Sequence, residues 1–341
     1  MSVRDSEIGV VRSGKGAGLT LAVLSAVTFG GSGVAAKPLI EAGLAPLEVV
    51  WLRITGAALV LLPVAWRHRE LLRRRPLMLL GFGMFAVAGV QAAYFAAISR
   101  IPVGVAMLVE YLAPALVLGW VRFVQRRQVA RAAALGVVLA VAGLACVVEI
   151  WSGLGFDPLG LLLAFGAACC QVAYFVLADH GSDGEREAPD PLGMIAFGLL
   201  VGCLAITLPA RPWAIDWQVL TGTVDMNGST VRAWVLVAWI VLLSTVLAYL
   251  TGVLSVRRLS PAVAGVVACL EAVVASAAAW LLLGEHLGAV QITGGVLVLV
   301  GALIAQSSAP ATPAAEPVAG GGGTVAAATG SEARAGDSGR P

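Results

Sequence analysis

Long apolar runs follow one another along most of the chain, each about as long as a helix needs to cross a bilayer. Taken as stretches bounded by charge, Pro or Gly, they predict ten membrane helices. The first five expected spans are Leu19–Ile40, Pro46–Trp66, Leu77–Ile98, Val103–Val124 and Ala132–Ile150. The second five are Leu159–Ala178, Leu192–Leu208, Ala233–Leu254, Ala262–Leu283 and Val290–Ala305. This pattern predicts an all-α integral membrane fold.

Composition supports the same fold class. Hydrophobic residues make up 59% of the chain and charged residues 12%, whereas a soluble domain carries about 25% charged residues. Residues 1–18 are polar and basic, and we expect a cytoplasmic tail there. The first apolar run is too long for a signal-peptide core, so it is kept as a membrane helix. Residues 306–341 are rich in Ala, Gly, Pro and Ser, which predicts a disordered cytoplasmic tail.

The positions of the basic residues predict the orientation of the chain in the membrane. If the N-terminus is cytoplasmic, sixteen Lys and Arg residues fall in inside segments and three fall outside, namely Arg100, Arg211 and Arg232. Basic residues concentrate in cytoplasmic loops, so both termini are expected inside. The Ala/Gly/Arg-rich composition is typical of GC-rich bacterial genomes, which predicts a multi-pass protein of the cell membrane.

A weak internal repeat divides the chain into two parts. Shifting the sequence by 158 residues places Arg100 on Arg258, Leu112 on Leu270, Gly136 on Gly294 and Gly143 on Gly301. The expected halves are residues 19–150 and 151–305, with five spans each. An odd number of spans per half inverts the second half in the membrane, which is the plan of many secondary transporters.

Two motifs resemble a known group of transporters. The stretch from Ala278 to Leu287, followed by Gln291 and Gly294, has the pattern LLLGE-x-L-x-x-x-Q-x-x-G. The first half carries Pro102-x-Gly104-x-Ala106-x-x-x-Glu110-x-x-x-Pro114. The chain resembles the drug/metabolite transporter superfamily and its ten-helix EamA family, and the first-half spacing resembles bacterial threonine/homoserine exporters. The resemblance covers about residues 17 to 306.

This resemblance implies a secondary transporter that exports amino acids or other small metabolites by alternating access between the halves. The sequence departs from the family pattern in two places. Arg126 and Arg127 stand where a first-half Gly-Glu is expected, and Glu271-Ala272 stands where Glu-Pro is common. A drug or multidrug exporter of the same fold therefore stays open, because one scaffold serves many solutes.

Two charged residues inside predicted spans are the leading candidates for the transport site. Glu110 lies about eight positions into the fourth span, where an ionised side chain costs at least about 2.5 kcal/mol. It is expected to bind a substrate ammonium or carry protons, or else to form a structural ion pair. Arg53 lies at a comparable depth in the second span. It is expected to be a counter-charge to Glu110, a clamp for a substrate carboxylate, or a structural partner.

Further polar residues are expected to face the interior rather than lipid. Gln91 and Tyr94 are three residues apart and share a helix face, as do Gln171 and Tyr174. Tyr249 and Glu271 lie inside the eighth and ninth spans. A cavity wall that binds substrate and ordinary bonding between helices both explain these six residues.

Other residues have simpler explanations. Lys37 lies four residues before Glu41, so a pair within one helix or a side chain reaching to the membrane surface is expected. Glu285 falls at a helix end near water and belongs to a turn that is expected to be structural. Small residues from Gly30 to Gly33 and at Gly198 and Gly202 favour close helix packing over a flexible gate.

The sequence also argues against other classes of protein. Residues 9–15 nearly form a phosphate-binding loop, but Gly16 stands where Ser or Thr should bind magnesium. His68, His180 and His286 fall in predicted loops, and no catalytic or metal-binding constellation appears. We therefore expect no enzyme, cofactor, metal or nucleic acid, and a small solute and the bilayer as partners. Proton coupling, a homodimer and a non-transporting membrane sensor or component stay open.

Overall fold

The computed structural model describes residues 3–126, 128, 130–149, 155–181, 190–256 and 261–307. The first part of the chain forms α1 (Val3–Glu41), α2 (Pro46–Val60), α3 (Leu62–Arg67), α4 (Glu70–Arg74), α5 (Pro76–Gly81), η1 (Phe82–Gly89), α6 (Val90–Ile98), α7 (Val103–Glu110), α8 (Ala113–Phe123) and α9 (Arg131–Val148). The expected cytoplasmic tail at residues 1–18 is helical from Val3 onward, because α1 begins there. The expected tail at 306–341 lies almost wholly outside the described residues.

The second part begins with α10 (Pro158–Gly181), α11 (Pro191–Ala210), η2 (Pro212–Ala214), α12 (Trp217–Thr221), β1 (Thr223–Met226) and β2 (Ser229–Arg232). It continues with α13 (Ala233–Ala238), η3 (Trp239–Leu247), α14 (Ala248–Val256), α15 (Pro261–Leu283) and α16 (Ala289–Ser307). The segments η1 and η3 are π-helical, and each continues directly into α-helix at both ends.

Six helices of the described residues are long and apolar enough to cross a membrane. They are Gly16–Glu41, Pro76–Ile98, Val103–Phe123, Arg131–Val148, Pro191–Ala210 and Ala233–Ser255. Shorter apolar helices cover Pro158–Tyr174, Cys269–Leu283 and Ala289–Ala305. The molecule is therefore a multi-pass helical protein, and the count of ten spans stays a prediction.

Several expected spans are interrupted. The second span divides at Leu61, two residues before Pro63, which cannot donate a backbone hydrogen bond. The fourth span breaks between Glu110 and Ala113, just before Pro114. Both helix breaks are explained by a proline, which is visible in the sequence.

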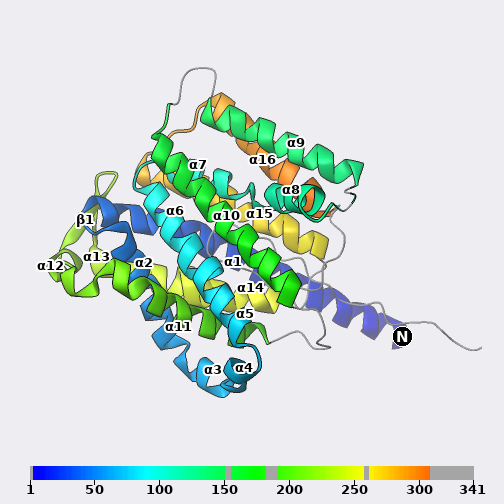
Figure 1. The fold of residues 1–341 in the computed structure, drawn as a ribbon, viewed down its shortest axis with the longest axis horizontal. Coiled ribbons are helices and arrows are strands. Elements are labelled where there is room, and N and C mark those ends of the chain that lie inside the picture. Colours follow the sequence, from blue (N-terminus) through cyan, green and yellow to red (C-terminus); the bar gives the residue numbers. More distant parts are fainter. Residues whose placement is uncertain are drawn as a thin grey trace, which may run out of the picture.

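The all-α expectation missed an antiparallel hairpin formed by β1 and β2. Asn227 and Gly228 make its turn, and both have positive φ, at 51° and 83°. A two-residue turn of this kind requires positive φ at both positions, which Asn-Gly readily adopts. The hairpin lies with α12 and α13 at the left of Figure 1, away from the N-terminus at the right.

Glycines allow the closest helix contact in the molecule, between α9 and α16. A Cβ on Gly143 would lie 2.6 Å from the carbonyl oxygen of Gly294, and a Cβ on Gly136 would lie 2.7 Å from that of Gly301. The two contacts run in opposite directions along the chain, so the helices are antiparallel. They lie side by side at the top of Figure 1.

Glycines in two other helices also pack closely, as expected from the sequence. A Cβ on Gly30 would lie 2.8 Å from the carbonyl oxygen of Glu271, which brings α1 against α15. A Cβ on Gly198 would lie 2.3 Å from the ring of Phe82, so α11 presses against η1. Close packing at these glycines is thus observed, whereas a gating role stays untested.

Candidate functional site

Arg53 lies at the centre of a polar cluster that joins four elements. Its side chain extends from α2 and the residue is only 2% exposed. The Nε–H donates to Thr245 Oγ1 at 2.8 Å, and Nη1 donates to Ser32 Oγ at 2.6 Å and Gln91 Oε1 at 2.8 Å. Nη2 donates to the carbonyl oxygen of Ser244 at 3.1 Å. These bonds connect α2 with α1, α6 and η3.

The bonds use four of the five N–H groups of the guanidinium. Every acceptor is neutral, and the ring of Phe95 adds a face contact, with its centroid 5.5 Å from Cζ. The direct ion pair expected between Arg53 and Glu110 is not formed in the described part of the chain. Among the described residues these bonds leave one N–H of the guanidinium, whereas a bidentate grip on a carboxylate needs two, so the geometry favours a structural role for Arg53.

The π-helical segment η3 supplies two of these acceptors, Thr245 Oγ1 and the carbonyl of Ser244. The hydroxyl of Thr245 donates to the carbonyl of Ile240, five residues earlier, at 2.7 Å. Wider π turns shift backbone carbonyls away from their α-helical partners and are frequent at functional sites. Ser32, Ser244 and Thr245 were missed by the sequence reasoning, and their signal is weak, namely hydroxyl residues in otherwise apolar spans.

Glu110 is the last residue of α7 and is fully buried, at 0% exposed. Neither carboxylate oxygen has a hydrogen-bond partner among the described residues. The helix stops here because Pro114 has no N–H for the Glu110 carbonyl. A helix carboxyl end carries partial negative charge, so the carboxyl group and the helix end would both favour a cation or a proton.

Tyr94 brings a second polar atom to the same region. Its hydroxyl has no hydrogen-bond partner in the described residues, and a Cβ on Gly33 would lie 2.5 Å from it. Tyr94 and Arg53 both lie within electrostatic range of Glu110 and Glu271. Buried polar atoms are usually bonded, so an unpartnered carboxylate and hydroxyl mark a candidate binding region.

The remaining predicted site residues all face the interior. Gln91, Gln171, Tyr174, Tyr249 and Glu271 are between 0% and 6% exposed. Tyr249 contacts Phe29 edge-on, with ring centroids 5.3 Å apart, and lies within electrostatic range of Arg53. Tyr174 contacts Phe82 edge-on, at 5.1 Å. The structure therefore gathers Arg53, Gln91, Tyr94, Tyr249, Glu110 and Glu271, whereas Gln171 and Tyr174 lie on α10 against η1 and α6.

A second polar cluster lies at one end of the bundle. Lys37 Nζ donates to Glu285 Oε1 at 2.5 Å, and the N–H of Val103 donates to Glu285 Oε2 at 2.8 Å. The expected pair between Lys37 and Glu41 is wrong, because Lys37 binds Glu285 instead, and a reach toward the membrane surface stays a prediction. Glu285, which follows α15, lies 248 positions away in sequence and is brought to Lys37 by the packing of α1 against α15.

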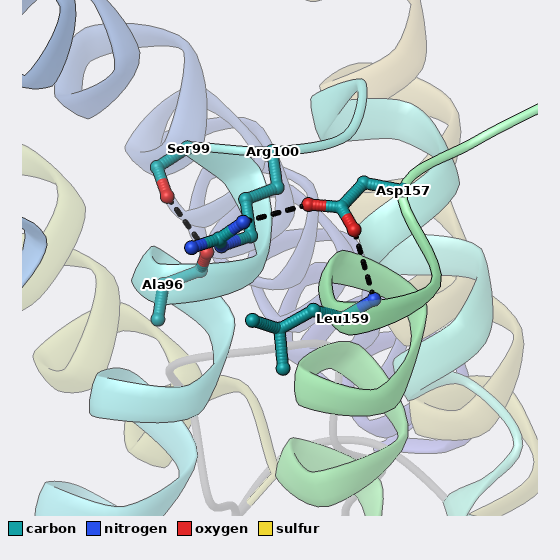
Figure 2. Close-up of polar contacts among 5 residues, drawn as sticks. All are labelled: Ala96, Ser99, Arg100, Asp157 and Leu159. Carbon is teal, nitrogen blue, oxygen red and sulfur yellow. Dashed lines mark hydrogen bonds and ion pairs between the residues drawn. The ribbon is translucent and has the colours of Figure 1, made fainter.

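Arg100 and Asp157 form an ion pair at the same end, with 2.8 Å between Nη1 and Oδ2 (Figure 2). Asp157 also accepts the N–H of Leu159 at 3.0 Å and so begins α10. The Arg100 hydrogen bond and then this backbone bond hold the pKa of the Asp157 carboxyl below its usual value. We call this the hairpin end, defined by Lys37, residues 99–103, Asp157, the hairpin 223–232 and the turn 284–288.

No cluster of His, Cys, Asp or Glu that could hold a metal ion occurs in the described residues. The buried polar cluster and the helices long enough to cross a membrane define a multi-pass membrane protein with a polar interior. Residues 16–149 and 158–306 both match the EamA-like transporter family. The chain belongs to this family and is therefore a membrane transporter.

Two curated relatives are similar over most of their length. The chain is 28% identical over 262 residues to the threonine/homoserine exporter RhtA of Escherichia coli (strain K12), covering 76% of this chain and 79% of the relative. It is 27% identical over 248 residues to the threonine/homoserine exporter RhtA of Salmonella typhimurium (strain SL1344), covering 72% and 76%. One solved structure superposes with a TM-score of 0.55 at 18% identity, over 85% of this chain and 96% of that one. This last likeness shows the fold alone.

Proposed function

We propose that this transporter exports amino acids or other small metabolites by alternating access between two inverted five-helix halves, residues 19–150 and 151–305. The observation that carries the proposal is Glu110, whose buried carboxyl group has no hydrogen-bond partner in the described residues and ends a broken helix. The similarity to threonine/homoserine exporters supports amino acids as the first substrates to test.

The contact between α9 and α16 supports inverted halves. The shift of 158 residues relates Gly136 to Gly294 and Gly143 to Gly301. The close contacts, however, join Gly136 to Gly301 and Gly143 to Gly294. Such exchanged pairing in an antiparallel contact is what a two-fold axis between the helices produces. The axis would relate one half to the other.

The π-helical segments support the same relation. The 158-residue shift carries η1 (Phe82–Gly89) onto residues 240–247, which lie within η3. It also carries α6 (Val90–Ile98) onto α14 (Ala248–Val256). The same irregular helix thus occurs at equivalent places in both halves, although the sequences of these segments differ.

The polar residues receive separate roles in this proposal. Glu110 binds the ammonium group of an amino acid or carries a proton, and the hydroxyl of Tyr94 offers a neutral polar contact next to Gly33 of α1. Arg53 holds α1, α2, α6 and η3 together and supplies positive charge to the interior. Gln91, Tyr249 and Glu271 line this region, and Gln171 and Tyr174 form the wall contributed by α10.

The test is efflux from bacterial cells preloaded with labelled threonine, homoserine and a panel of other amino acids. We expect faster efflux in cells that contain the protein, and at least a tenfold loss of that increase in Glu110→Gln at equal membrane level. Glutamine keeps the shape of the side chain but cannot ionise. Glu70→Gln is the matched control, because Glu70 is exposed and pairs with Arg74 on its own helix.

Two results would overturn parts of the proposal. If no amino acid leaves the cells faster, the substrate class is wrong, and drugs and other metabolites become the next panel. If Glu110→Gln exports at the parent rate, Glu110 has a structural role. Repeating the assay with the proton gradient collapsed separates proton coupling from ammonium binding, because only coupled efflux then stops.

A further inference from the structure

Glu285 connects three elements that belong to different expected halves. It accepts hydrogen bonds from Lys37 of α1 and from the backbone N–H of Val103 at the start of α7. Lys37 and Val103 lie in the first half, and Glu285 lies in the second. Glu285 therefore joins the two halves at the hairpin end, where the exposed Arg100–Asp157 pair also connects them.

This junction lies directly beyond the candidate binding region. Along α1, Ser32 binds Arg53, and the next residue, Gly33, faces the hydroxyl of Tyr94 and the side chain of Val103. Lys37 is four residues further along the helix. At a rise of about 1.5 Å per residue, it stands roughly 6 Å nearer the hairpin end than Gly33.

The turn that carries Glu285 is held in place by two features. Gly284 has φ of +69°, a conformation that other residues rarely adopt. A Cβ on Gly284 would lie 3.1 Å from the side-chain oxygen of Asn227, at the tip of the hairpin. The tip of the hairpin thus packs on the turn that carries Glu285.

The exposed fractions of the side chains indicate which contacts between the halves can break. The side chains of Lys37 and Glu285 are 17% and 13% exposed, so water can hydrate both charges when they part. Arg53, by contrast, is almost wholly buried, and separating it from its acceptors would leave a charge unsolvated. The Lys37–Glu285 junction can therefore open without stranding a charge, and so can the more exposed Arg100–Asp157 pair beside it.

We propose that Lys37, Glu285 and the N–H of Val103 form a gate that closes the solute pathway at the hairpin end. The gate rests on the proposed transport function. It opens when Glu285 releases both donors, and the hairpin and the Gly284 turn move away from α1 with it. In the described structure the gate is closed, because both hydrogen bonds to Glu285 are formed.

The test measures access to Val103, which is fully buried next to the gate. Val103→Cys is placed in a background whose five native cysteines are replaced, and the purified protein is labelled with a polar maleimide. We expect slow labelling in this parent and at least fivefold faster labelling with Glu285→Gln or Lys37→Met. Lys37→Arg keeps the charge and should label slowly.

Glu48→Gln is the matched control. Glu48 lies at the same end, but its carboxylate accepts the N–H of Ala45 and so caps its own helix. Labelling that stays slow in both Glu285→Gln and Lys37→Met would overturn the gate. An equal increase in Glu48→Gln would also overturn it, because general loosening of this end would then explain the result.

A cross-link separates failure of the gate from failure of the transport proposal. Lys37→Cys and Glu285→Cys are joined by a short reducible bismaleimide, and efflux is measured before and after reduction. We expect at least a tenfold loss of efflux that reduction restores, and unimpaired efflux while cross-linked would overturn the gate. If the parent exports nothing, the proposed function fails, whereas the labelling rates still decide whether the junction opens.

Discussion

The guanidinium of Arg53 shows how this protein holds a charge inside a bundle of apolar helices. Its partners in the described residues are hydroxyl, amide and backbone oxygens and an aromatic face. Hydrogen bonds to a charged group contribute about 1.5–3 kcal/mol each. The loss of two of these bonds should therefore destabilise the whole bundle.

Arg53→Lys tests this role. Lysine has one nitrogen and cannot reach Thr245, Ser32 and the Ser244 carbonyl together. We expect the Tm in detergent, measured by intrinsic fluorescence, to fall by on the order of 10 °C. Arg122→Lys is the control, because Arg122 is exposed on α8. A transport defect in Arg53→Lys with an unchanged Tm would instead make Arg53 a substrate contact.

The Arg100–Asp157 pair should make stability depend on pH. Because the pKa of Asp157 is lowered in the folded state, its contribution is complete above the unfolded pKa of about 3.9 and is lost as pH falls through the folded pKa. We expect Asp157→Asn to lower the Tm slightly at pH 7. Its difference from the parent should shrink below about pH 4, as measured by Tm across a pH series. A difference that persists at low pH would contradict this assignment.

At the scale of elements, the close approach of α9 and α16 gives the sharpest prediction. Gly143→Ala would place a Cβ 2.6 Å from backbone atoms of Gly294 and Val298, so one helix must move. Overpacking of this kind costs about 1–3 kcal/mol. We expect a lower Tm in detergent and a broader peak in size-exclusion chromatography.

Gly166→Ala is the matched substitution on α10. Among the described residues no atom outside its own helix lies within 4 Å of its Cβ position. Alanine in an open helical position is favoured by about 1 kcal/mol over glycine. Its Tm should equal or exceed that of the parent, and a Gly143→Ala protein as stable as Gly166→Ala would show that the α9–α16 contact is loose.

The sequence predicted most helices because long apolar runs and proline breaks are local signals. The inward-facing positions of Gln91, Tyr94, Gln171, Tyr174 and Tyr249 could also be predicted, since lipid disfavours polar groups. The hairpin was missed although Asn227-Gly228 is a strong turn signal. Its two strands have only four residues each, so they do not stand out between two long apolar runs.

The candidate site was harder to predict, because it depends on contacts between distant segments. Arg53 meets Ser32 of α1 and Thr245 of η3, which are separated from it by 21 and 192 positions. Spacing along the sequence suggests only partners that are close in sequence. It therefore predicted that Lys37 pairs with Glu41, whereas Lys37 binds Glu285. Similarly, nothing in the apolar sequence of η3 indicates a π turn that frees the Ser244 carbonyl.

At the scale of the whole molecule, the Lys37–Glu285 junction lies at the hairpin end, beyond the buried polar cluster around Arg53. The Arg53, Tyr94 and Glu110 region is buried, and the Lys37–Glu285 junction closes it toward the hairpin end. For an exporter, the direction in which this end faces decides whether the gate controls release or uptake of the solute. Since basic residues concentrate in the segments opposite the hairpin, we expect the hairpin to face outside the cell.

Cysteine labelling in intact cells measures this orientation. In the cysteine-free background, Ser229→Cys on the hairpin should react fully with an impermeant maleimide, because Ser229 is exposed on β2. Glu70→Cys on α4, whose side chain is 78% exposed at the other end, should react only after the cells are permeabilised. Labelling of Glu70→Cys but not Ser229→Cys in intact cells would invert the orientation. The Lys37–Glu285 gate would then face the cytoplasm and control entry of the solute instead of its release.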